Sequence, residues 1–438
     1  MAQIRQKWQV AAVMMGAFVL LSATVLVRGK FAAPTTSYNE QLKMARYLLH
    51  GTGFVCPVGP ERNDPSSWYS PGYIALMSAI MAGFGEDSAV SLAAIRLANI
   101  TAMSVAIGLY FLLGLRQFGP KVAWLTVALI LLSPSLLFKA DEIWDTSWAL
   151  LGGAFLLVLF VTVKLKNPLA LLGSGLACGG VAMINPCFTL CYPVWVVYSW
   201  WTQRKPGQKA ISLLRHSTIV LIGFVIAILP WTIRNYLTFG ELFYLRGNLP
   251  LELWSGNASW SDGYGDAVQG NKPHPVFHES ETQRMTELGE YGYFKACRED
   301  VARWWKQDKT RFVHLTLRRM GWFWFGRYDF DLSPSRLLLK IIGVAISSMA
   351  GILGALVVVW KRREGLVLIA TLLLFPIPYY VTQIMVRYRL PIEPVILLLA
   401  AIGLAELWTA KKHPLTKNSL RSLSEHNNPP LNPTADYH

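Results

Sequence analysis

The sequence predicts an all-α integral membrane protein with about ten transmembrane helices. Hydrophobic residues make up 53% of the 438 residues, and charged residues only 15%. Apolar runs of about 20 residues, the length that crosses the hydrocarbon core of a bilayer, recur along the chain. Lys and Arg gather between alternate runs, as the positive-inside rule expects of cytoplasmic loops. Composition, run length and charge distribution therefore agree on a multi-pass membrane protein.

One shorter apolar run decides the topology. Residues 72–85, GYIALMSAIMAGFG, are few for a span and follow Pro71. We interpret them as a half-helix that dips into the membrane face; a full span is the alternative and would invert everything after it. The ten remaining runs lie near residues 10–28, 88–114, 120–138, 144–163, 168–185, 188–201, 213–233, 336–360, 365–383 and 391–409. With the N-terminus inside, these ten runs place the short basic segments in the cytoplasm, which favours the half-helix.

This topology divides the chain into four parts. Residues 1–235 form an N-terminal transmembrane module, whose first outer loop, 29–87, carries juxtamembrane helices. Residues 236–334 form a large extracytoplasmic loop between spans 7 and 8, in which apolar spacing predicts amphipathic surface helices. Residues 335–410 are the C-terminal transmembrane helices, and the polar, Pro- and Asn-rich segment 411–438 is expected to be a disordered cytoplasmic tail.

The net charge of +15 argues for lipid contact and against nucleic acid. Most of this charge falls on the predicted cytoplasmic loops, where it orients the protein and meets anionic lipid. The sequence has no Walker loop, no dinucleotide-binding fingerprint and no Ser-His-Asp elbow motif. Membrane lipids are therefore expected partners, and nucleic acid is not.

Several motifs in a fixed order resemble those of a known enzyme class. They are SYNEQLKMARYLLHGTGF (37–54), NDPSSWYSPGY (63–73), FG (84–85), PWTIRNYLTFGELFYLRGNLPLELWSGN (230–257), HPVFHES (274–280) with LGEYGYFKACRED (288–300), and YYVTQIMVRYRLPIEP (379–394). This ordered set resembles bacterial membrane glycosyltransferases of the GT-C class, relatives of the protein mannosyltransferase and lipid A aminoarabinose transferase group. The resemblance covers most of residues 10–410.

The resemblance implies a glycosyltransferase of the bacterial inner membrane with both termini in the cytoplasm. It implies transfer of a sugar from a polyprenyl-phosphate donor to an acceptor hydroxyl on the extracytoplasmic face. The acceptor is a lipid, a glycan or a protein. Two alternatives are a lipid-linked-sugar flippase or transporter, which should show inverted repeats, and a glycan ligase or polymerase with a diphosphate-linked donor.

Glu40 is the first candidate for the catalytic base. In the class that the motifs resemble, an acid in the first outer loop activates the acceptor hydroxyl, and many members carry an Asp where this chain has Ser37. A carboxylate within reach of a hydroxyl lowers the barrier by taking its proton, and one carboxylate suffices for a single inverting displacement. The alternative is structural, because Ser37 and Glu40 have the spacing of a capping box. Asp145 and Glu142 are the next candidates.

A departing polyprenyl phosphate requires fixed cations or amide donors near its developing negative charge. The expected donor-phosphate ligands are Arg387 and Arg389 in the RYR motif, Lys139 and Arg234. Arginine suits phosphate because its planar fork provides several donors. Snorkelling to lipid headgroups is the alternative for Lys139 and Arg234. The acids Asp141, Glu142 and Asp145 are alternatively ion-pair partners of these cations.

Aromatic and polar side chains complete the expected substrate site. Trp68, Tyr69 and Tyr73 are candidates because aromatic faces stack on sugar rings, although such residues also anchor proteins at the membrane interface. The Gly- and Asn-rich large loop has the composition of a binding loop and adds Asn257 and His274. No metal ligand is assigned, because no spacing matches a dedicated metal motif; a divalent metal ion stays open as a cofactor.

Overall fold

The computed structural model describes residues 2–31, 33, 39–59, 63–205, 210–265, 273–327 and 334–412. Ser37 and the predicted tail beyond residue 412 lie outside these ranges. Within them the regular secondary structure is helical, and extended pairing is limited to two isolated bridges. The prediction of an all-α protein is therefore confirmed.

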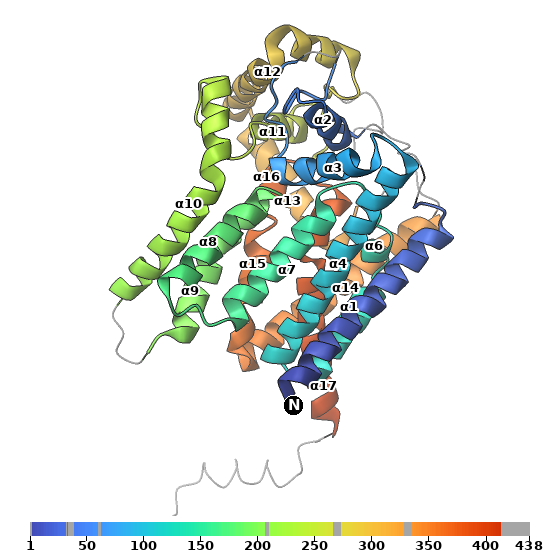
Figure 1. The fold of residues 1–438 in the computed structure, drawn as a ribbon, viewed down its shortest axis with the longest axis vertical. Helices are drawn as coiled ribbons and strands as arrows, with labels where there is room; N and C mark the ends of the chain where they lie inside the picture. Colours follow the sequence, from blue (N-terminus) through green and yellow to red (C-terminus); the bar gives the residue numbers. More distant parts are fainter. Residues whose placement is uncertain are drawn as a thin grey trace, which may run out of the picture.

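A bundle of long helices carries a cap of shorter helices at one end (Figure 1). The bundle contains α1 (Ala2–Val27), α4 (Ala89–Gln117), α5 (Pro120–Leu131), α7 (Thr146–Thr162), α8 (Pro168–Ala182), α9 (Tyr192–Gln203), α10 (Ile211–Phe239), α14 (Pro334–Lys361), α15 (Leu366–Leu374) and α17 (Glu393–Lys412). The cap contains α2 (Glu40–Leu49), α11 (Leu249–Asn257) and α12 (Glu279–Gln307), and α3 (Pro71–Phe84) and α13 (Lys309–Phe325) lie where cap and bundle meet. The N-terminus lies at the end of the bundle away from the cap. The cap thus gathers the helices of the two segments predicted as outer loops.

Six segments among the described residues are long and apolar enough to cross a membrane. They are Gln3–Val27, Ala89–Gln117, Ile211–Phe239, Gly343–Lys361, Arg363–Val381 and Arg387–Thr409. A multi-pass membrane protein is confirmed, whereas the expected ten spans are not. Proline explains part of the difference, because the residue before proline disfavours the helical conformation. The run 120–138 breaks before Pro134 into α5 and the short α6 (Pro134–Leu137).

The centre and the rim of the bundle differ in burial. In the apolar windows of Ala89–Gln117 and Arg387–Thr409, 67% and 78% of the residues are buried, against 17% in Ile211–Phe239 and 22% in Gly343–Lys361. Helices α4 and α17 therefore belong to the core, and α10 and α14 turn apolar side chains outward. In a membrane protein such outward apolar faces contact lipid.

Helix α3 corresponds to the run 72–85, for which the sequence left a half-helix and a full span open. It lies across the cap end of the bundle in Figure 1. It packs against α2 and α4. The amide of Gly72 donates to the carbonyl of Met183 over 2.9 Å, and a Cβ atom at residue 72 would lie 2.9 Å from the same oxygen. Only glycine permits this approach, which fixes the start of α3 to the end of α8.

Candidate active site

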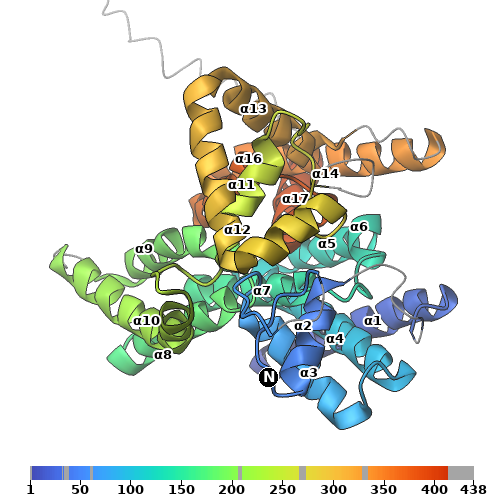
Figure 2. The same cartoon turned by 90° about the horizontal axis from the view of Figure 1, so that it is seen from above.

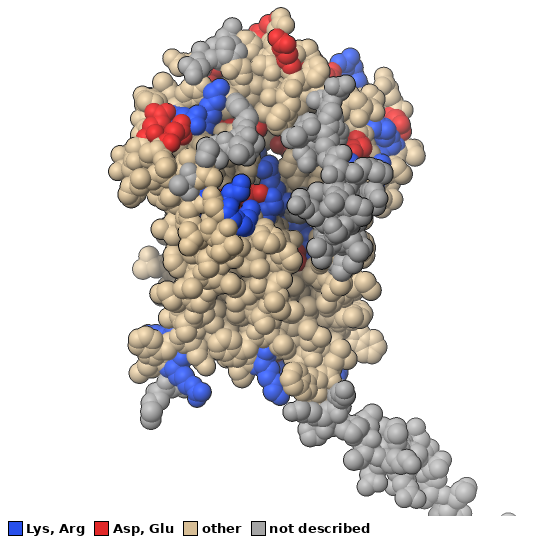
Figure 3. Space-filling view, turned by 90° about the vertical axis from the view of Figure 1, so that its right-hand side faces the viewer, with Lys and Arg blue, Asp and Glu red and all other residues tan. Residues whose placement is uncertain are grey.

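Five charged side chains from five segments converge where the cap meets the bundle. The carboxylates are Glu40 at the start of α2, Asp145 before α7 and Glu252 in α11. The guanidinium groups are Arg246 and Arg387, the latter in η3 (Val386–Ile392). The charges of these groups act on one another across the site. We call this group of five residues the charged recess. On the face drawn in Figure 3, Lys and Arg side chains gather around a hollow at this level.

Asn39 sets the position of Glu40. Asn39 is the N-cap of α2: its side-chain oxygen accepts from the amide of Leu42 over 2.9 Å, and its Nδ2 atom donates to the carbonyl of Ile143 over 2.7 Å. The second bond ties α2 to the segment that carries Asp145. Glu40 is the first residue of the helix and Asn39 caps it; Ser37, the other member of the capping box that the sequence offered, lies outside the described residues.

The carboxylate of Glu40 is buried and has no side-chain hydrogen-bond partner among the described residues. Burial raises the pKa of Glu40; the positive charge of Arg387 opposes this shift, and the negative charge of Glu252 adds to it. Removal from water destabilises the charged form of an acid, so such a carboxyl binds a proton more readily than an exposed one. Glu40 can therefore accept a proton from a group that enters the recess.

The other two carboxylates are held by amide side chains. Glu252 accepts from Asn248 Nδ2 over 3.0 Å and from Gln383 Nε2 over 2.5 Å, and Asn185 lies beside Asp145 and lowers its pKa. Burial raises the pKa of both acids, and the two arginines of the recess oppose that shift. Glu252 is thus anchored by two amide side chains, whereas Glu40 has a hydrogen bond only with its own backbone among the described residues.

Aromatic rings frame the two arginines. Arg387 lies over the ring of Trp144, with its guanidinium carbon 4.0 Å from the ring centroid. Arg246 lies 5.0 Å over Tyr69, and its Nε atom donates to the carbonyl of Trp68 over 3.0 Å. A guanidinium that stacks on an aromatic face keeps edge donors for an anion. The arrangement can therefore bind a phosphate beside the carboxylates.

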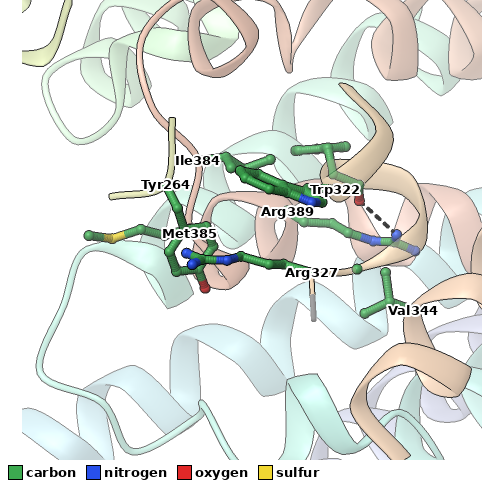
Figure 4. Close-up of a pocket in the computed structure, with 9 residues that line it drawn as sticks. Tyr264, Trp322, Arg327, Val344, Ile384, Met385 and Arg389 are labelled. Atoms are coloured by element: carbon green, nitrogen blue, oxygen red, sulfur yellow. Dashed lines mark hydrogen bonds between the residues drawn. The ribbon is translucent and has the colours of Figure 1, made fainter. Parts of the chain in front are cut away.

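Arg389, the second arginine of the RYR motif, is outside the recess. It forms an ion pair with Glu393 and donates to Ser347 and Ser348, both over 2.7 Å, and to the carbonyl of Phe323 over 3.1 Å. Figure 4 shows its side chain beside Trp322, along the wall of a different pocket. The structure thus gives Arg389 a supporting role, and its donors are already engaged.

Arg234 also supports the fold, by holding the first outer loop. It donates to the carbonyl of Ser66 over 2.8 Å and to that of Phe54 over 3.3 Å. Glu290 holds the same loop from the other side: it accepts from Ser66 Oγ and from the amide of Ser67, both over 2.6 Å. Gly289 makes this contact possible, because its φ of 70° and ψ of 162° kink α12 in a conformation that is essentially confined to glycine.

Lys139 and Glu142 pair with each other at the edge of the cap. Asp141 pairs with Arg28 over 2.9 Å. The expectation that the acids of this segment pair with nearby cations is confirmed for Lys139 and Glu142. Of the three acids, only Asp145 belongs to the charged recess.

Of the expected substrate-binding residues, Tyr69 alone lines the recess. The structure places the other four outside the recess. Trp68 packs edge-on against Phe294, with ring centroids 5.7 Å apart, and Tyr73 bonds to Asn99 in the helix core. The remaining two residues lie within the cap. The side-chain oxygen of Asn257 accepts from Arg319 over 2.7 Å. The ring of His274 packs against Trp68, and burial lowers the pKa of His274 to about 4.

The sequence did not single out Arg246 and Glu252. Both lie in the segment 230–257 that carried the resemblance, and they flank the short stretch GNLPL. The sequence did contain a signal for these two residues: a charged residue stands on each side of the stretch, next to a predicted membrane span. Among the described residues, no group of three or more His, Cys, Asp or Glu side chains is arranged to hold a metal ion.

Comparison with known proteins finds no match to the sequence but several matches to the fold. No protein-family model and no curated protein sequence matches the chain. The fold is similar to that of the archaeal oligosaccharyltransferase AglB from Archaeoglobus fulgidus, solved with an inhibitory peptide and a dolichol-phosphate, with a TM-score of 0.51 and 14% identity. That match covers 98% of this chain and 53% of AglB, so the chain spans about half the length of AglB.

Two structures of ArnT from Cupriavidus metallidurans also match. The form bound to undecaprenyl phosphate has a TM-score of 0.39 and 12% identity, over 92% of this chain and 79% of ArnT. The apo form has a TM-score of 0.36 and 13% identity, over 89% and 78%. The match to AglB shows that the chain shares the fold of that membrane protein.

Proposed function

We propose that the protein transfers a sugar from a polyprenyl-phosphate donor to an acceptor hydroxyl, with inversion at the anomeric carbon. The observation that carries this proposal is the charged recess, where the carboxylate of Glu40 lies in the field of Arg387. Such transfer requires a base for the hydroxyl proton and a cation for the leaving phosphate within one site. The recess has both, at the level where a lipid-linked substrate would meet the cap.

Glu40 is the proposed base. The acceptor oxygen attacks C1 of the sugar while Glu40 takes the hydroxyl proton. The bond between C1 and the phosphate oxygen breaks, and polyprenyl phosphate leaves with the bonding electron pair. Glu40 suits this task better than Glu252, because Glu252 already accepts hydrogen bonds from two amide side chains. Asp145, which lies beside Asn185, is the next candidate.

Arg387 and Arg246 are the proposed ligands of the donor phosphate. They reach the recess from two segments far apart in the sequence. Arg387 lies over the ring of Trp144 and Arg246 over that of Tyr69, so both are held in place before the substrate arrives. Fixed donors stabilise a leaving phosphate without a cost of reorganisation. The dolichol-phosphate bound to AglB supports a monophosphate lipid as the carrier in this fold.

In this proposal the cap faces the extracytoplasmic side of a bacterial inner membrane. The N-terminus lies at the opposite end of the bundle, which the proposal assigns to the cytoplasm. The basic segments predicted between spans support this orientation. The shape of the recess selects the sugar and the acceptor, and the transfer assay identifies both.

The test is transfer of label from radiolabelled polyprenyl-phosphate sugars by the purified protein in proteoliposomes. An envelope extract supplies the acceptor, and parallel reactions with EDTA decide the metal requirement. Wild type is compared with Glu40→Gln and with a matched control, Glu142→Gln, which removes an acid that lies outside the recess and pairs with Lys139.

We expect wild type and Glu142→Gln to transfer label and Glu40→Gln to lose about 10²- to 10⁴-fold in rate. Equal activity of all three proteins would remove Glu40 from the reaction and direct attention to Asp145 and Glu252. If wild type consumes no monophosphate donor but releases a diphosphate lipid, the protein is a ligase or polymerase. Movement of intact donor across the bilayer without transfer would make it a flippase.

A further inference from the structure

The segment between α6 and α7 makes a tight turn just before it enters the charged recess. The amide of Trp144 donates to the carbonyl of Glu142, two residues back, over 2.9 Å. A bond between residues i and i+2 closes a three-residue γ-turn. The turn 142–144 ends at Trp144 and is followed by Asp145, so its geometry decides where both side chains enter the recess.

Two asparagine side chains bind the carbonyl oxygens of this turn from two different helices. Asn99 in α4 donates from Nδ2 to the carbonyl of Glu142 over 2.7 Å. Asn39, the N-cap of α2, donates from Nδ2 to the carbonyl of Ile143 over 2.7 Å. The two carbonyls belong to consecutive residues, so the turn is tied to α4 and to α2 at neighbouring atoms. We call Asn39 and Asn99 the asparagine clamp.

The orientation of the Asn99 amide is itself determined by its neighbours. Asn99 is fully buried, and its Oδ1 atom accepts from Trp148 Nε1 over 3.0 Å. An indole N–H is only a donor and a backbone carbonyl is only an acceptor, so the amide can satisfy both in one orientation alone. The oxygen must face Trp148 of α7, and the nitrogen must face the turn.

The clamp joins four helices around the turn. Besides its bonds to α7 and to the turn, Asn99 Nδ2 donates to the hydroxyl of Tyr73 in α3 over 3.0 Å. In Figure 2, which looks onto the cap, α2, α3, α4 and α7 lie beside one another. The turn therefore rests on a rigid base of packed helices, although it belongs to an irregular segment.

The turn places the ring on which Arg387 lies. The guanidinium carbon of Arg387 is 4.0 Å from the ring centroid of Trp144, and Arg387 forms no ion pair among the described residues. The ring of Trp144 also lies 6.4 Å from that of Tyr69, which carries Arg246. A shift of Trp144 would therefore move the support of one guanidinium group and disturb that of the other.

We propose that Asn39 and Asn99 are positioning residues for the phosphate site. They hold the turn 142–144 so that the ring of Trp144 directs Arg387 at the phosphate of a polyprenyl-phosphate lipid. Neither asparagine touches the phosphate; each acts through a carbonyl of the turn. This inference rests on the proposed function, because it takes Arg387 as a ligand of the donor phosphate. Donors that are fixed in advance bind a phosphate without a cost of reorganisation.

The first test is a double-mutant cycle on the Kd for a radiolabelled polyprenyl monophosphate, measured with the purified protein in detergent. Asn99→Ala is made alone and together with Arg387→Ala. Tyr73→Phe is the matched control, because it removes one bond to the Asn99 amide and leaves the bonds to Glu142 and Trp148 in place.

A second variant tests the other half of the clamp. Asn39→Ser keeps a hydroxyl that can cap α2, but its side chain is too short to reach the carbonyl of Ile143. It is also combined with Arg387→Ala. Where Asn99→Ala does not fold, this variant decides the cycle.

We expect Asn99→Ala and Asn39→Ser each to weaken phosphate binding by about tenfold, and to weaken it no further when residue 387 is already alanine. Tyr73→Phe should bind as wild type does. Additive losses in the double variants would show that the asparagines do not act through Arg387 and would overturn the proposal. Wild-type affinity in both asparagine variants would overturn it as well.

Hydrogen exchange measures the turn without reference to a ligand. We expect the amides of residues 142–146 to exchange several-fold faster in both asparagine variants than in wild type and in Tyr73→Phe. Unchanged exchange in the asparagine variants would remove the clamp. A wild type that neither binds polyprenyl phosphate nor transfers sugar would contradict the proposed function and this inference with it. An active wild type with an additive cycle would contradict this inference alone.

Discussion

Arg387 and Arg389 lie two residues apart in η3 and enter two different environments. Arg387 stacks on Trp144 in the charged recess. Arg389 lies between the bundle and α13, where Glu393, Ser347, Ser348 and backbone carbonyls engage its donors. The same contrast separates the acids: Glu40 has no side-chain hydrogen-bond partner among the described residues, whereas Glu290 accepts bonds from Ser66 and Ser67. A buried charged group whose hydrogen-bond partners lie within the protein supports the fold. A buried charged group with fewer such partners can bind a ligand.

Truncation of the two arginines is expected to have large effects of two different kinds. Arg387→Ala should lower turnover of a polyprenyl-phosphate sugar by about 10²- to 10³-fold with little change in Tm, because it removes a fixed donor for the leaving phosphate. Arg389→Ala should instead lower stability by about 3–5 kcal/mol, because it leaves Glu393 buried without its partner. Transfer assays and thermal unfolding of both variants test the contrast. Two variants with the same pattern of loss would contradict it.

Glu290 sharpens the comparison between the acids. Glu290→Gln keeps the size of the side chain but weakens three hydrogen bonds from Ser66 and Ser67. Bonds to a charged group contribute about 1.5–3 kcal/mol, so we expect a loss of stability of this order. The Tm in detergent is the measurement, with Glu40→Gln as the matched variant. Glu40→Gln should leave Tm unchanged, and a larger drop for Glu40→Gln than for Glu290→Gln would reverse the assignment.

The pH dependence of turnover tests the coupling of Glu40 to Arg387. Burial raises the pKa of Glu40, and a base acts only when ionised, so kcat/KM should rise with pH through a value above that of an ordinary carboxyl. Arg387→Gln removes a charge that lowers this pKa, and the acid limb of its residual activity should move to higher pH. Arg389→Gln should leave the limb in place. An unmoved limb in both variants would show that Arg387 does not act on the base.

The smallest effect is expected at the rim. Lys139→Gln and Glu142→Gln each break a partly exposed ion pair, and such pairs contribute about 0–1 kcal/mol. We therefore expect Tm and turnover close to those of wild type. A clear loss of activity in Lys139→Gln would return Lys139 to the donor-phosphate ligands and extend the recess to the rim.

The candidate site was partly predictable from the sequence. Glu40, Tyr69 and Arg387 lie in motifs that were recognisable in order along the chain, and Asp145 was named as a further acid candidate outside those motifs. Glu40, Asp145 and Arg387 meet in the recess, and Tyr69 lines it. Trp68 and Tyr73 were equally plausible as stacking residues, because nothing in a linear segment shows which aromatic ring turns inward. The two neighbouring side chains point in different directions: Trp68 packs in the core of the cap, and Tyr69 lies under Arg246.

Arginines were the hardest residues to assign. Arg234 and Arg389 had the expected residue type and place along the chain, yet both are engaged with carbonyl oxygens from segments more than 60 residues away. Arg246, which the sequence did not single out, contacts Tyr69 and Trp68 from a distance of about 180 residues along the chain. The role of an arginine depends on which acceptors surround it, and those acceptors come from other parts of the chain.

The sequence by itself determined the class of fold, the apolar helices and the motifs that contain four residues of the recess, because hydrophobic runs, prolines and local charge act over a few turns of chain. Tertiary structure alone decided which of the arginines and acids are already paired. It also decided that α13 turns Arg311 and Arg319 toward carbonyl oxygens of the cap. The physical reason is that hydrogen-bond partners and burial are properties of assembled segments, and a buried charge acquires its role only when its neighbours are in place.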